Sequence, residues 1–396
     1  MTDSGPLERD QTWRRAAYRS AGGYFWYFAA IGAIWPFAPL YYRELGLDGA
    51  QIGALTALPA LAMALLGPVF GAIADARGVH RLMLCGAMTI AAVAALAVSQ
   101  VSSFWPLFLL IGVLAIAAVP IPALLDSYAL VVGERTGISY GRLRVCGSLG
   151  YMGISLLVGL IIRDDVSNVF LLVYAGCLVM ALVAVVGFPA ISERRPRPLF
   201  GSLGIVRGNA RLQLLLATAF VIAIGNAVIG TFLGLRIQDL GGSTGLVGGA
   251  FAISALAELP IVAFGGWFLA RLGPVRMIAM ALLAYVIRLV INAGIETPEL
   301  LLFSQLLHGV TYGAFLIASV TLAYRIAGKE EAATAQALLS AMSFGLGSIV
   351  GSLVGGALLD RIGTQGIFLV TAVLMAVTLA LFLVGNRVVR LQDAGT

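Results

Sequence analysis

Twelve apolar stretches constrain the fold of this chain more than any other feature. They lie at 22–42, 50–72, 82–101, 105–131, 144–162, 168–188, 212–235, 246–268, 275–294, 299–323, 334–357 and 366–386. A helix of about 20 apolar residues crosses the roughly 30 Å hydrocarbon core of a bilayer. Only 11% of the residues are charged, against about 25% in a typical soluble domain. We therefore expect an all-α membrane protein with about twelve transmembrane helices in a lipid bilayer.

The basic residues predict the orientation of these helices. Of the 25 Lys and Arg residues, 20 fall in the N-terminal segment, the even-numbered connections and the C-terminal segment, and only four in the odd-numbered connections. Cytoplasmic loops carry the excess of Lys and Arg. We expect a multi-pass protein of the plasma (inner) membrane with both termini in the cytoplasm. The net charge of +6 is then a result of topology, and no nucleic-acid partner is expected.

The longest basic connection divides the chain into two halves. Residues 190–211 contain four arginines before Arg211 and two prolines between spans six and seven. Six helices on each side is the arrangement of two parallel repeats in a transporter. We expect an N-terminal six-helix bundle over 1–189, a cytoplasmic linker over 190–211 and a C-terminal six-helix bundle over 212–396.

A short motif recurs after equivalent spans and predicts a gate. After span two it comprises Gly71, Asp75, Gly78 and Arg81, with Arg77 beside them. After span eight the same offsets hold Gly266, Ala270, Gly273 and Arg276, and after span eleven Gly356, Asp360 and Gly363 repeat the first three positions. Glycine lets helices approach, and Asp75 can pair with Arg77 or Arg81 to hold one state closed. The alternative is a tight basic turn without a gating role.

Charged side chains inside the spans are costly, and they usually serve function. They are Asp126 in span four, Glu258 in span eight, Arg288 in span nine and His308 in span ten, and Arg144 opens span five. Static ion pairs, Asp126 with Arg144 and Glu258 with Arg288, are the structural alternative. His308 shares a helix face with polar residues at spacings of three and four, which favours a cavity wall.

The same charges allow two kinds of substrate. The Arg144 guanidinium could bind a carboxylate through two parallel hydrogen bonds, with aromatic walls from Tyr24, Trp35 and Tyr151, which suits an aromatic acid. Asp126 beside it suits a hydroxyl-rich sugar or nucleoside better. The sequence leaves both classes open.

Several of these segments resemble lactose permease-like and phenylpropionate permease-like proton symporters of the major facilitator superfamily. Tyr140-Gly141-Arg142-Leu143-Arg144, continuing to Gly147, Gly150 and Tyr151, is similar to the start of their fifth helix. Further similar segments are Asp126 after Pro120 and Pro122, Pro36-Phe37 with Pro39-Leu40-Tyr41, Glu258 with Pro260, Arg288, and Gln305-Leu306-Leu307-His308-Gly309. The resemblance implies the two-bundle fold and proton symport, with substrate bound between the halves.

The sequence also departs from lactose permease in ways that bear on mechanism. The glutamate one turn after the helix-ten histidine is replaced by Thr311, and the tryptophan that stacks on the sugar by Tyr151. Ile261 replaces a polar side chain after the helix-eight acid, and Gln305 replaces a lysine. These changes weaken a lactose-like sugar assignment and leave Glu258 as the carboxylate inside a span of the second half. We expect Glu258, with Arg288 and His308, to carry proton coupling, because burial favours its neutral form and a nearby cation its anion.

A proton-coupled importer of a small organic solute, working as a monomer, is the function that the sequence favours. An exporter of drugs or metabolites, an uncoupled facilitator, and a membrane receptor or enzyme are the alternatives. We expect no enzyme, because no nucleophile–base pair or metal cluster is evident, and no cofactor or metal is expected. A phosphate-binding glycine-rich loop with its lysine is also missing, which argues against an ATP-driven pump.

Overall fold

The structure, a computed structural model, describes residues 6–162, 168–189 and 204–391, with side chains from residue 13 onward. No strand occurs within these ranges. The first half contains α1 (Pro6–Ile34), α2 (Ala38–Glu44), α3 (Gly49–Arg77), α4 (His80–Val98), α5 (Phe104–Ala118), α6 (Pro120–Thr136), α7 (Tyr140–Ile161) and α8 (Val169–Val185). The second half contains α9 (Gly204–Arg207), α10 (Ala210–Asp239), α11 (Thr244–Ala263), α12 (Gly265–Gly294), α13 (Leu300–Ser304), α14 (Ala314–Ser340) and α15 (Gly347–Val389).

Eight of the described helical segments are long and apolar enough to cross a membrane. Three of the long helices contain a glycine with left-handed backbone, Gly273 in α12, Gly328 in α14 and Gly363 in α15. L residues with side chains rarely adopt this conformation, so the chain turns sharply at these points. Divided at these turns, the described helices are consistent with the twelve predicted crossings.

Two predicted spans are broken, which corrects the sequence-based expectation of continuous helices. The span at 22–42 ends as α1 at Ile34 and resumes as α2 after the turn that contains Pro36. The span at 105–131 divides into α5 and α6 before Pro120. Proline has no backbone N–H and its ring clashes with the preceding turn, so it ends or kinks a helix. The breaks therefore follow from the prolines themselves.

Span ten is irregular around His308. A 3-10 turn covers Gln305–Leu307, and a π-helical turn covers Gly309–Gly313. A second π-helical segment, Ala341–Leu346, joins α14 to α15. Single π turns within helices frequently mark functional sites. The segment that carries His308 is thus shaped differently from the regular helices around it.

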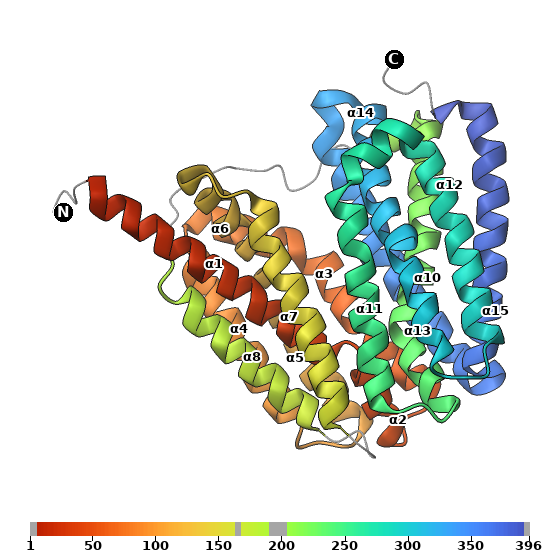
Figure 1. Cartoon of the computed structure of the whole chain (residues 1–396), viewed down its shortest axis with the longest axis horizontal. Helices are drawn as coiled ribbons and strands as arrows, with labels where there is room; N and C mark the ends of the chain where they lie inside the picture. Colours follow the sequence, from red (N-terminus) through yellow and green to blue (C-terminus); the bar gives the residue numbers. More distant parts are fainter. Residues whose placement is uncertain (1–5, 163–167, 190–203, 392–396) are drawn as a thin grey trace.

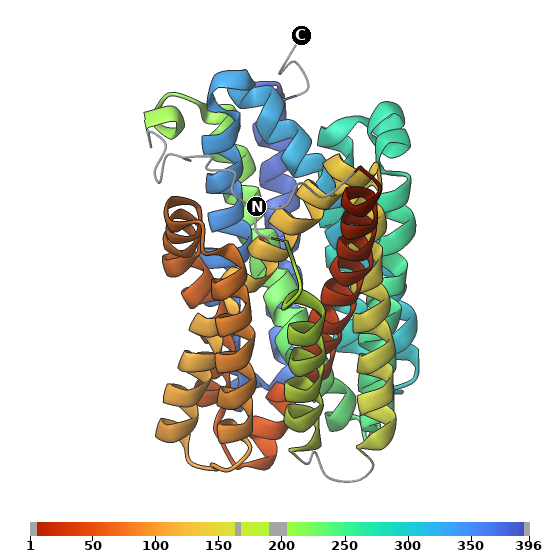
Figure 2. The ribbon, with the colours of Figure 1, turned by 90° about the vertical axis from the view of Figure 1, so that its left-hand side faces the viewer.

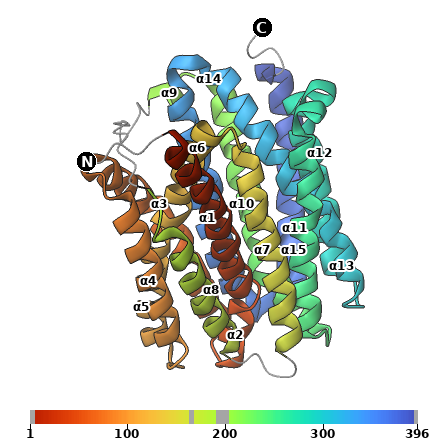
Figure 3. The same cartoon turned by 60° about the vertical axis from the view of Figure 1, so that its left-hand side comes forward.

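The helices pack as two groups (Figures 1 and 2). In the first half α1 packs on α7 and α8, and in the second half α15 packs on α10 and α12. The halves meet where α3 contacts α15 and α7 contacts α11; the neighbouring positions of α7 and α11 are visible in Figures 1 and 3. This arrangement confirms the predicted all-helical fold with two helical repeats. The domain limits stay a prediction, and residues 190–203, with Arg194, Arg195 and Arg197, lie outside the described residues.

Large apolar side chains cover the outer surface of the helices. Leu65, Val183 and Val373 are each more than 60% exposed, and many other leucines and valines along the spans are also exposed. A soluble monomer rarely exposes such a continuous apolar surface. Lipid is the solvent that this surface requires.

Helices α1 and α7 cross at very short distance because glycines lie at the crossing. A methyl group on Gly150 would collide with the carbonyl of Phe25, and one on Gly32 with the carbonyl of Tyr151. Close approach through small residues is typical of helix packing in membranes. The crossing fixes α7, which carries Arg144, against α1, which carries Tyr24.

Among the described residues, all hydrogen bonds between the halves lie at one end of the molecule. We call this the far end, formed by residues 43–49, 155–162, 235–248 and 356–364. Its contacts include Arg43–Asp239 (2.5 Å), Gly49 N–Asp360 (2.9 Å), Ser155–Gly248 O (3.3 Å) and Thr244–Gly159 O (3.1 Å). Figure 1 shows the two groups of helices approaching each other near α2 and spreading apart towards the end that carries both termini. The far end is therefore the closed end.

Candidate functional site

A four-residue cluster in the first half centres on Asp126. Its Oδ1 accepts hydrogen bonds from the Tyr24 hydroxyl at 2.5 Å and the Tyr140 hydroxyl at 2.9 Å. Nη1 of Arg144 lies 3.5 Å from the same oxygen and donates to the Tyr140 hydroxyl at 2.6 Å. Two helices, α1 and α7, thus direct three side chains at one carboxylate oxygen of α6. We call these four residues the Asp126 cluster.

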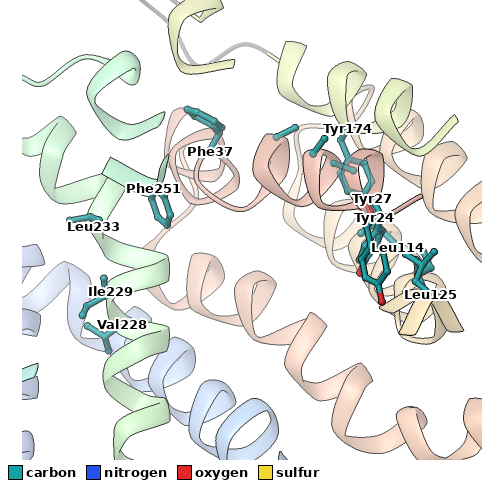
Figure 4. Packing of buried hydrophobic residues seen from close by; sticks show 14 of the residues in the cluster. Tyr24, Tyr27, Phe37, Leu114, Leu125, Tyr174, Val228, Ile229, Leu233 and Phe251 are labelled. Atoms are coloured by element: carbon teal, nitrogen blue, oxygen red, sulfur yellow. The ribbon is translucent and has the colours of Figure 1, made fainter. Parts of the chain in front are cut away.

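Local structure explains how α7 contributes two members of this cluster. Tyr140 is the first residue of α7, and Arg144 follows four positions later, so both side chains lie on one helix face. The Arg144 guanidinium also lies over the Tyr140 ring, 5.9 Å from its centroid. Tyr24 packs in the buried aromatic region of α1, beside Tyr27, Leu125 and Tyr174 (Figure 4).

Part of the cluster remains open to a ligand. Oδ2 of Asp126 makes no hydrogen bond within the described part of the chain, and the Arg144 side chain is 51% exposed. Nη1 is the only Arg144 nitrogen with a hydrogen-bond partner among the described residues. The acceptor Oδ2 of Asp126 and the donors Nε and Nη2 of Arg144 are therefore available to a ligand next to each other. The ion pair of the structural alternative is present at 3.5 Å, and the substrate-binding role of both residues stays a prediction.

A second cluster in the other half surrounds Arg288, a side chain only 1% exposed. Its Nη1 lies 3.0 Å from Nδ1 of His308 and 3.2 Å from the Thr311 hydroxyl, and its Nη2 donates to Oε1 of Gln305. The 3-10 and π turns place these three partners on the side of span ten that faces α12. In the described ranges no carboxylate lies within ion-pair distance of this guanidinium. We call these four residues the Arg288 cluster.

Buried polar side chains extend the Arg288 cluster towards the far end. Gln305 contacts Ser254 at 3.3 Å and Ser304 at 2.6 Å, and Ser304 donates to Asn292 at 2.6 Å. Nε of Arg288 and Nδ2 of Asn292 are buried without a partner. Polar groups in such a network are costly unless satisfied, which indicates that the cluster has a role other than stability.

Glu258 lies apart from the Arg288 cluster, which corrects the expected pairing. Within the described residues it forms no hydrogen bond with Arg288 or His308. A methyl group on Gly313 would lie 3.3 Å from Cγ of Glu258, so the carboxylate lies beside the π turn. Its charge interacts with Arg144 of the other half, and it is in electrostatic range of Tyr151 and Tyr312. Glu258 therefore lies beside the π turn of its own half, within electrostatic range of residues of both halves.

The aromatic side chains predicted to line the site occupy different places. Tyr151 lies on α7, at the crossing with Gly32 of α1, and in electrostatic range of Glu258. Trp35 lies eleven residues after Tyr24, or about 16 Å along the helix. It packs next to Gly230 of α10 and is 49% exposed. The structure thus brings Tyr24 and Tyr151 towards the charged groups and leaves Trp35 nearer the far end.

The predicted gate residues are paired differently from the sequence-based expectation. Asp75 contacts Nε2 of His80 at 3.1 Å, and Arg81 donates to the carbonyl of Phe188 at 3.2 Å. Arg77 is exposed at the last turn of α3. His80 is the buried first residue of α4.

The glycines of the gate motif also differ from the expectation. A methyl group on Gly71 would meet no atom within 4 Å, so no close helix contact uses this glycine in the present conformation. Gly78 ends α3 with left-handed backbone (φ 63°), a conformation that glycine adopts without strain. The gating role of Gly71, Asp75, Arg77, Gly78 and Arg81 stays a prediction.

Tyr140 is the residue that sequence reasoning missed. It belongs to the segment that resembles the symporters, but of that segment only Arg144 and Tyr151 were assigned to the substrate site. A signal was present, since a tyrosine four positions before a functional arginine shares its helix face. In the second half Tyr312 lies on the predicted helix face of His308, and its ring stacks on the His308 ring with the centroids 5.5 Å apart.

The described residues contain no group of three or more His, Cys, Asp or Glu side chains that could hold a metal ion. Cys85, Cys146 and Cys177 are free thiols. The site is therefore described by its two charged clusters and the aromatic side chains near them.

Two groups of membrane-spanning helices that meet at the far end form a fold of the major facilitator type. The chain belongs to the MFS_1 like family, whose profile matches residues 18–370.

Individual relatives agree with this placement. The chain is 29% identical over 371 residues to a maltose permease of Geobacillus stearothermophilus, covering 91% of this chain and 92% of the relative. It is 26% identical over 400 residues to multidrug resistance protein MdtG of Dickeya zeae, covering 94% and 93%. Among solved structures it is similar in fold to a variant of the nucleoside transporter NupG, with TM-score 0.87, 18% identity, and 93% and 99% of the chains covered.

Proposed function

We propose that this protein moves a small, neutral, hydroxyl-rich solute, of the sugar or nucleoside class, across the plasma (inner) membrane by alternating access, with a proton as the coupled ion. The open half of the Asp126 cluster is the observation that carries this proposal. An acceptor, Asp126 Oδ2, lies beside the donors of Arg144 that remain without a hydrogen-bond partner. A hydroxyl group, which donates and accepts at once, is complementary to that pair.

An anionic substrate fits the same site less well. A carboxylate that approached Arg144 would also approach Asp126, and like charges at short distance repel. Arg144 already shares Nη1 between Asp126 and Tyr140. The names of the relatives point the same way, since one is a maltose permease and the structural neighbour a nucleoside transporter.

Glu258 is the group that we propose for proton coupling. It is a largely buried carboxylate without a hydrogen-bond partner in the described ranges, and Arg144 in the opposite half attracts its charge. Movement of the halves changes the separation of the two groups. Closing the site therefore stabilises the anion and opening it favours the neutral form, which couples proton binding to the transport cycle.

The closed far end supports alternating access as the transport mode. If both termini are cytoplasmic, as the basic residues predict, the far end is periplasmic and this conformation is open to the cytoplasm. A transporter of this kind exposes a central site to one side at a time by rocking of its halves.

A thermal-shift screen of the purified protein tests the substrate class. A ligand that binds the folded state raises the melting temperature. We expect maltose or uridine at millimolar concentration to stabilise the parent protein, and Asp126→Asn to lose that effect. Stabilisation by 3-phenylpropionate alone would overturn the neutral-substrate proposal.

Export is the second candidate, favoured by the similarity to multidrug resistance proteins. The direction depends on whether proton and solute move together or in exchange, which a transport measurement distinguishes. Inverted membrane vesicles that accumulate an apolar cation, but neither maltose nor uridine, would support the exporter.

A further inference from the structure

We infer that Tyr140 is a positioning residue that sets the orientation of Arg144 for substrate. The inference rests on the proposed function and adds a residue that neither the charge pattern nor the relatives assign. Among the residues that the structure describes, Tyr140 is the one side chain that hydrogen-bonds to both charged members of the Asp126 cluster: its hydroxyl donates to Asp126 and accepts from Arg144.

The geometry of this contact limits how Arg144 can move. The hydroxyl holds Nη1 at 2.6 Å, while the ring lies under the guanidinium at 5.9 Å. Arg144 Nη1 is 3.5 Å from Asp126, at the long end of a hydrogen bond. The tyrosine hydroxyl therefore makes the shorter of the two contacts and bridges the pair. Nε and Nη2 are left to face a ligand.

Tyr24 provides an internal comparison. It donates to the same oxygen of Asp126 at 2.5 Å, but no hydrogen bond joins it to Arg144 among the described residues. Loss of the Tyr24 hydroxyl therefore alters the carboxylate only, whereas loss of the Tyr140 hydroxyl alters both charged groups. Comparison of variants at Tyr24 and Tyr140 therefore distinguishes an effect on Asp126 from an effect on Arg144.

The test compares Tyr140→Phe with Tyr324→Phe, a tyrosine on the surface of α14 that is 46% exposed. The Phe variant keeps the ring and removes only the hydroxyl. We expect the half-saturating concentration for exchange of maltose or uridine, whichever the parent carries, to rise about tenfold, since a hydrogen bond to a charged group is lost. The maximal exchange rate and the melting temperature should remain those of the parent.

A measurement without substrate keeps the inference testable if neither solute is carried. Phenylglyoxal modifies arginine, and mass spectrometry reports its rate at Arg144 alone. We expect Tyr140→Phe to increase that rate several-fold and Tyr24→Phe to change it less. An unchanged rate at Arg144, or a fall in maximal exchange without a change in half-saturation, would overturn the positioning role. Failure of both solutes in the parent would instead count against the proposed substrate class.

A different observation carries a second inference: we propose that Arg43, Asp239 and Asp360 form an outer latch that holds the far end closed. Arg43 in the first half contacts Asp239 at 2.5 Å, and Asp239 also accepts from Thr364 at 2.6 Å. Arg43 donates to Gln238 as well. The ion pair is thereby anchored in the second half on two helices, α10 and α15.

Asp360 adds a contact of a different kind. It belongs to the third copy of the glycine–aspartate motif, and its Oδ2 accepts from the backbone N–H of Gly49 at 2.9 Å. Gly49 is the first residue of α3, whose own cap is Asp48. A negative charge is stabilising at a helix N-terminus, so α15 supplies a second anion to a helix of the other half. The motif copy thus acts at the end opposite to Asp75.

Distances between spin labels test the latch. Labels on Ser102→Cys and Glu296→Cys, exposed positions of the two halves at the far end, are introduced after replacement of the three native cysteines. We expect Asp239→Asn with Asp360→Asn to move the distance distribution towards longer values. Arg361→Gln, a change of the neighbouring exposed charge, should leave the distribution unchanged.

Charge exchange completes this test. Arg43→Asp combined with Asp239→Arg should restore the short distances that Arg43→Asp alone loses. Two results would overturn the latch. One is an unchanged distribution in the Asp239→Asn, Asp360→Asn protein, and the other is an equal shift in the Arg361→Gln control.

Discussion

Arg144 is the residue on which the account of substrate binding depends most. Replacement by lysine keeps the charge but removes the planar fork of donors. We expect Arg144→Lys to weaken binding roughly 10- to 100-fold, as for loss of a charge-assisted hydrogen bond of about 1.5–3 kcal/mol, while the protein still inserts. Titration calorimetry with the stabilising solute measures the change.

Arg142→Lys is the matched control for this prediction. Arg142 lies on the same helix two positions earlier and is exposed, outside the Asp126 cluster. The Arg142→Lys protein should bind the solute with the affinity of the parent. Near-parental affinity in Arg144→Lys would show that the guanidinium does not contact the solute.

The sequence identified the charged residues at this scale but not their partners. Asp126, Glu258, Arg288 and His308 stand out because charges inside spans are rare. Which groups meet depends on the rotation of each helix about its axis and on side-chain conformation. The opposite charges of Glu258 and Arg288 allow a pair, but within the described residues no hydrogen bond or ion pair joins them, and Glu258 lies beside Gly313.

At the scale of helices, the crossing of α1 and α7 is predicted to be intolerant of larger side chains. Gly150→Val would drive a side chain into the carbonyl of Phe25. Overpacking of this kind costs about 1–3 kcal/mol, so we expect a melting temperature lower by several degrees, measured by the fluorescence of the detergent-solubilised protein.

Gly153 provides the control for this crossing. It lies on the same helix, and a methyl group there would meet no atom within 4 Å. The Gly153→Val protein should have the melting temperature of the parent. Equal melting of the Gly150→Val and Gly153→Val proteins would mean that the helices separate without cost.

Helix irregularities were only partly predictable from the sequence. Pro36 and Pro120 interrupt their spans for a reason that local chemistry supplies, and both breaks could have been expected. The π turn at Gly309–Gly313 depends on packing against α11 and α12, which no local pattern encodes. The third copy of the motif was recognised as a repeat, but only the folded chain shows Asp360 against Gly49.

At the scale of the whole molecule, the two ends are expected to respond in opposite ways to loss of an aspartate. If Asp75 stabilises the outward-open state, Asp75→Asn should shift the population further towards the present conformation. Accessibility of single cysteines placed at each end to a membrane-impermeant reagent measures this shift. Identical accessibility in parent and variant would mean that the motif after α3 is only a turn.

Proton-driven accumulation tests the central claim most directly. Each proton moved down a membrane potential supplies about 2.3 kcal/mol per 100 mV, enough for roughly a 50-fold concentration ratio. The measurement is uptake of radiolabelled maltose or uridine into proteoliposomes under an imposed pH gradient, for the parent, for Glu258→Gln and for the exposed control Glu299→Gln.

We expect the parent and Glu299→Gln to concentrate the solute, and Glu258→Gln to lose accumulation while it still exchanges internal for external solute. Exchange requires the loaded protein to change sides but never to release the proton. Accumulation by Glu258→Gln equal to that of the parent would contradict the role of this carboxylate, and a parent that equilibrates the solute without concentrating it would contradict proton coupling itself.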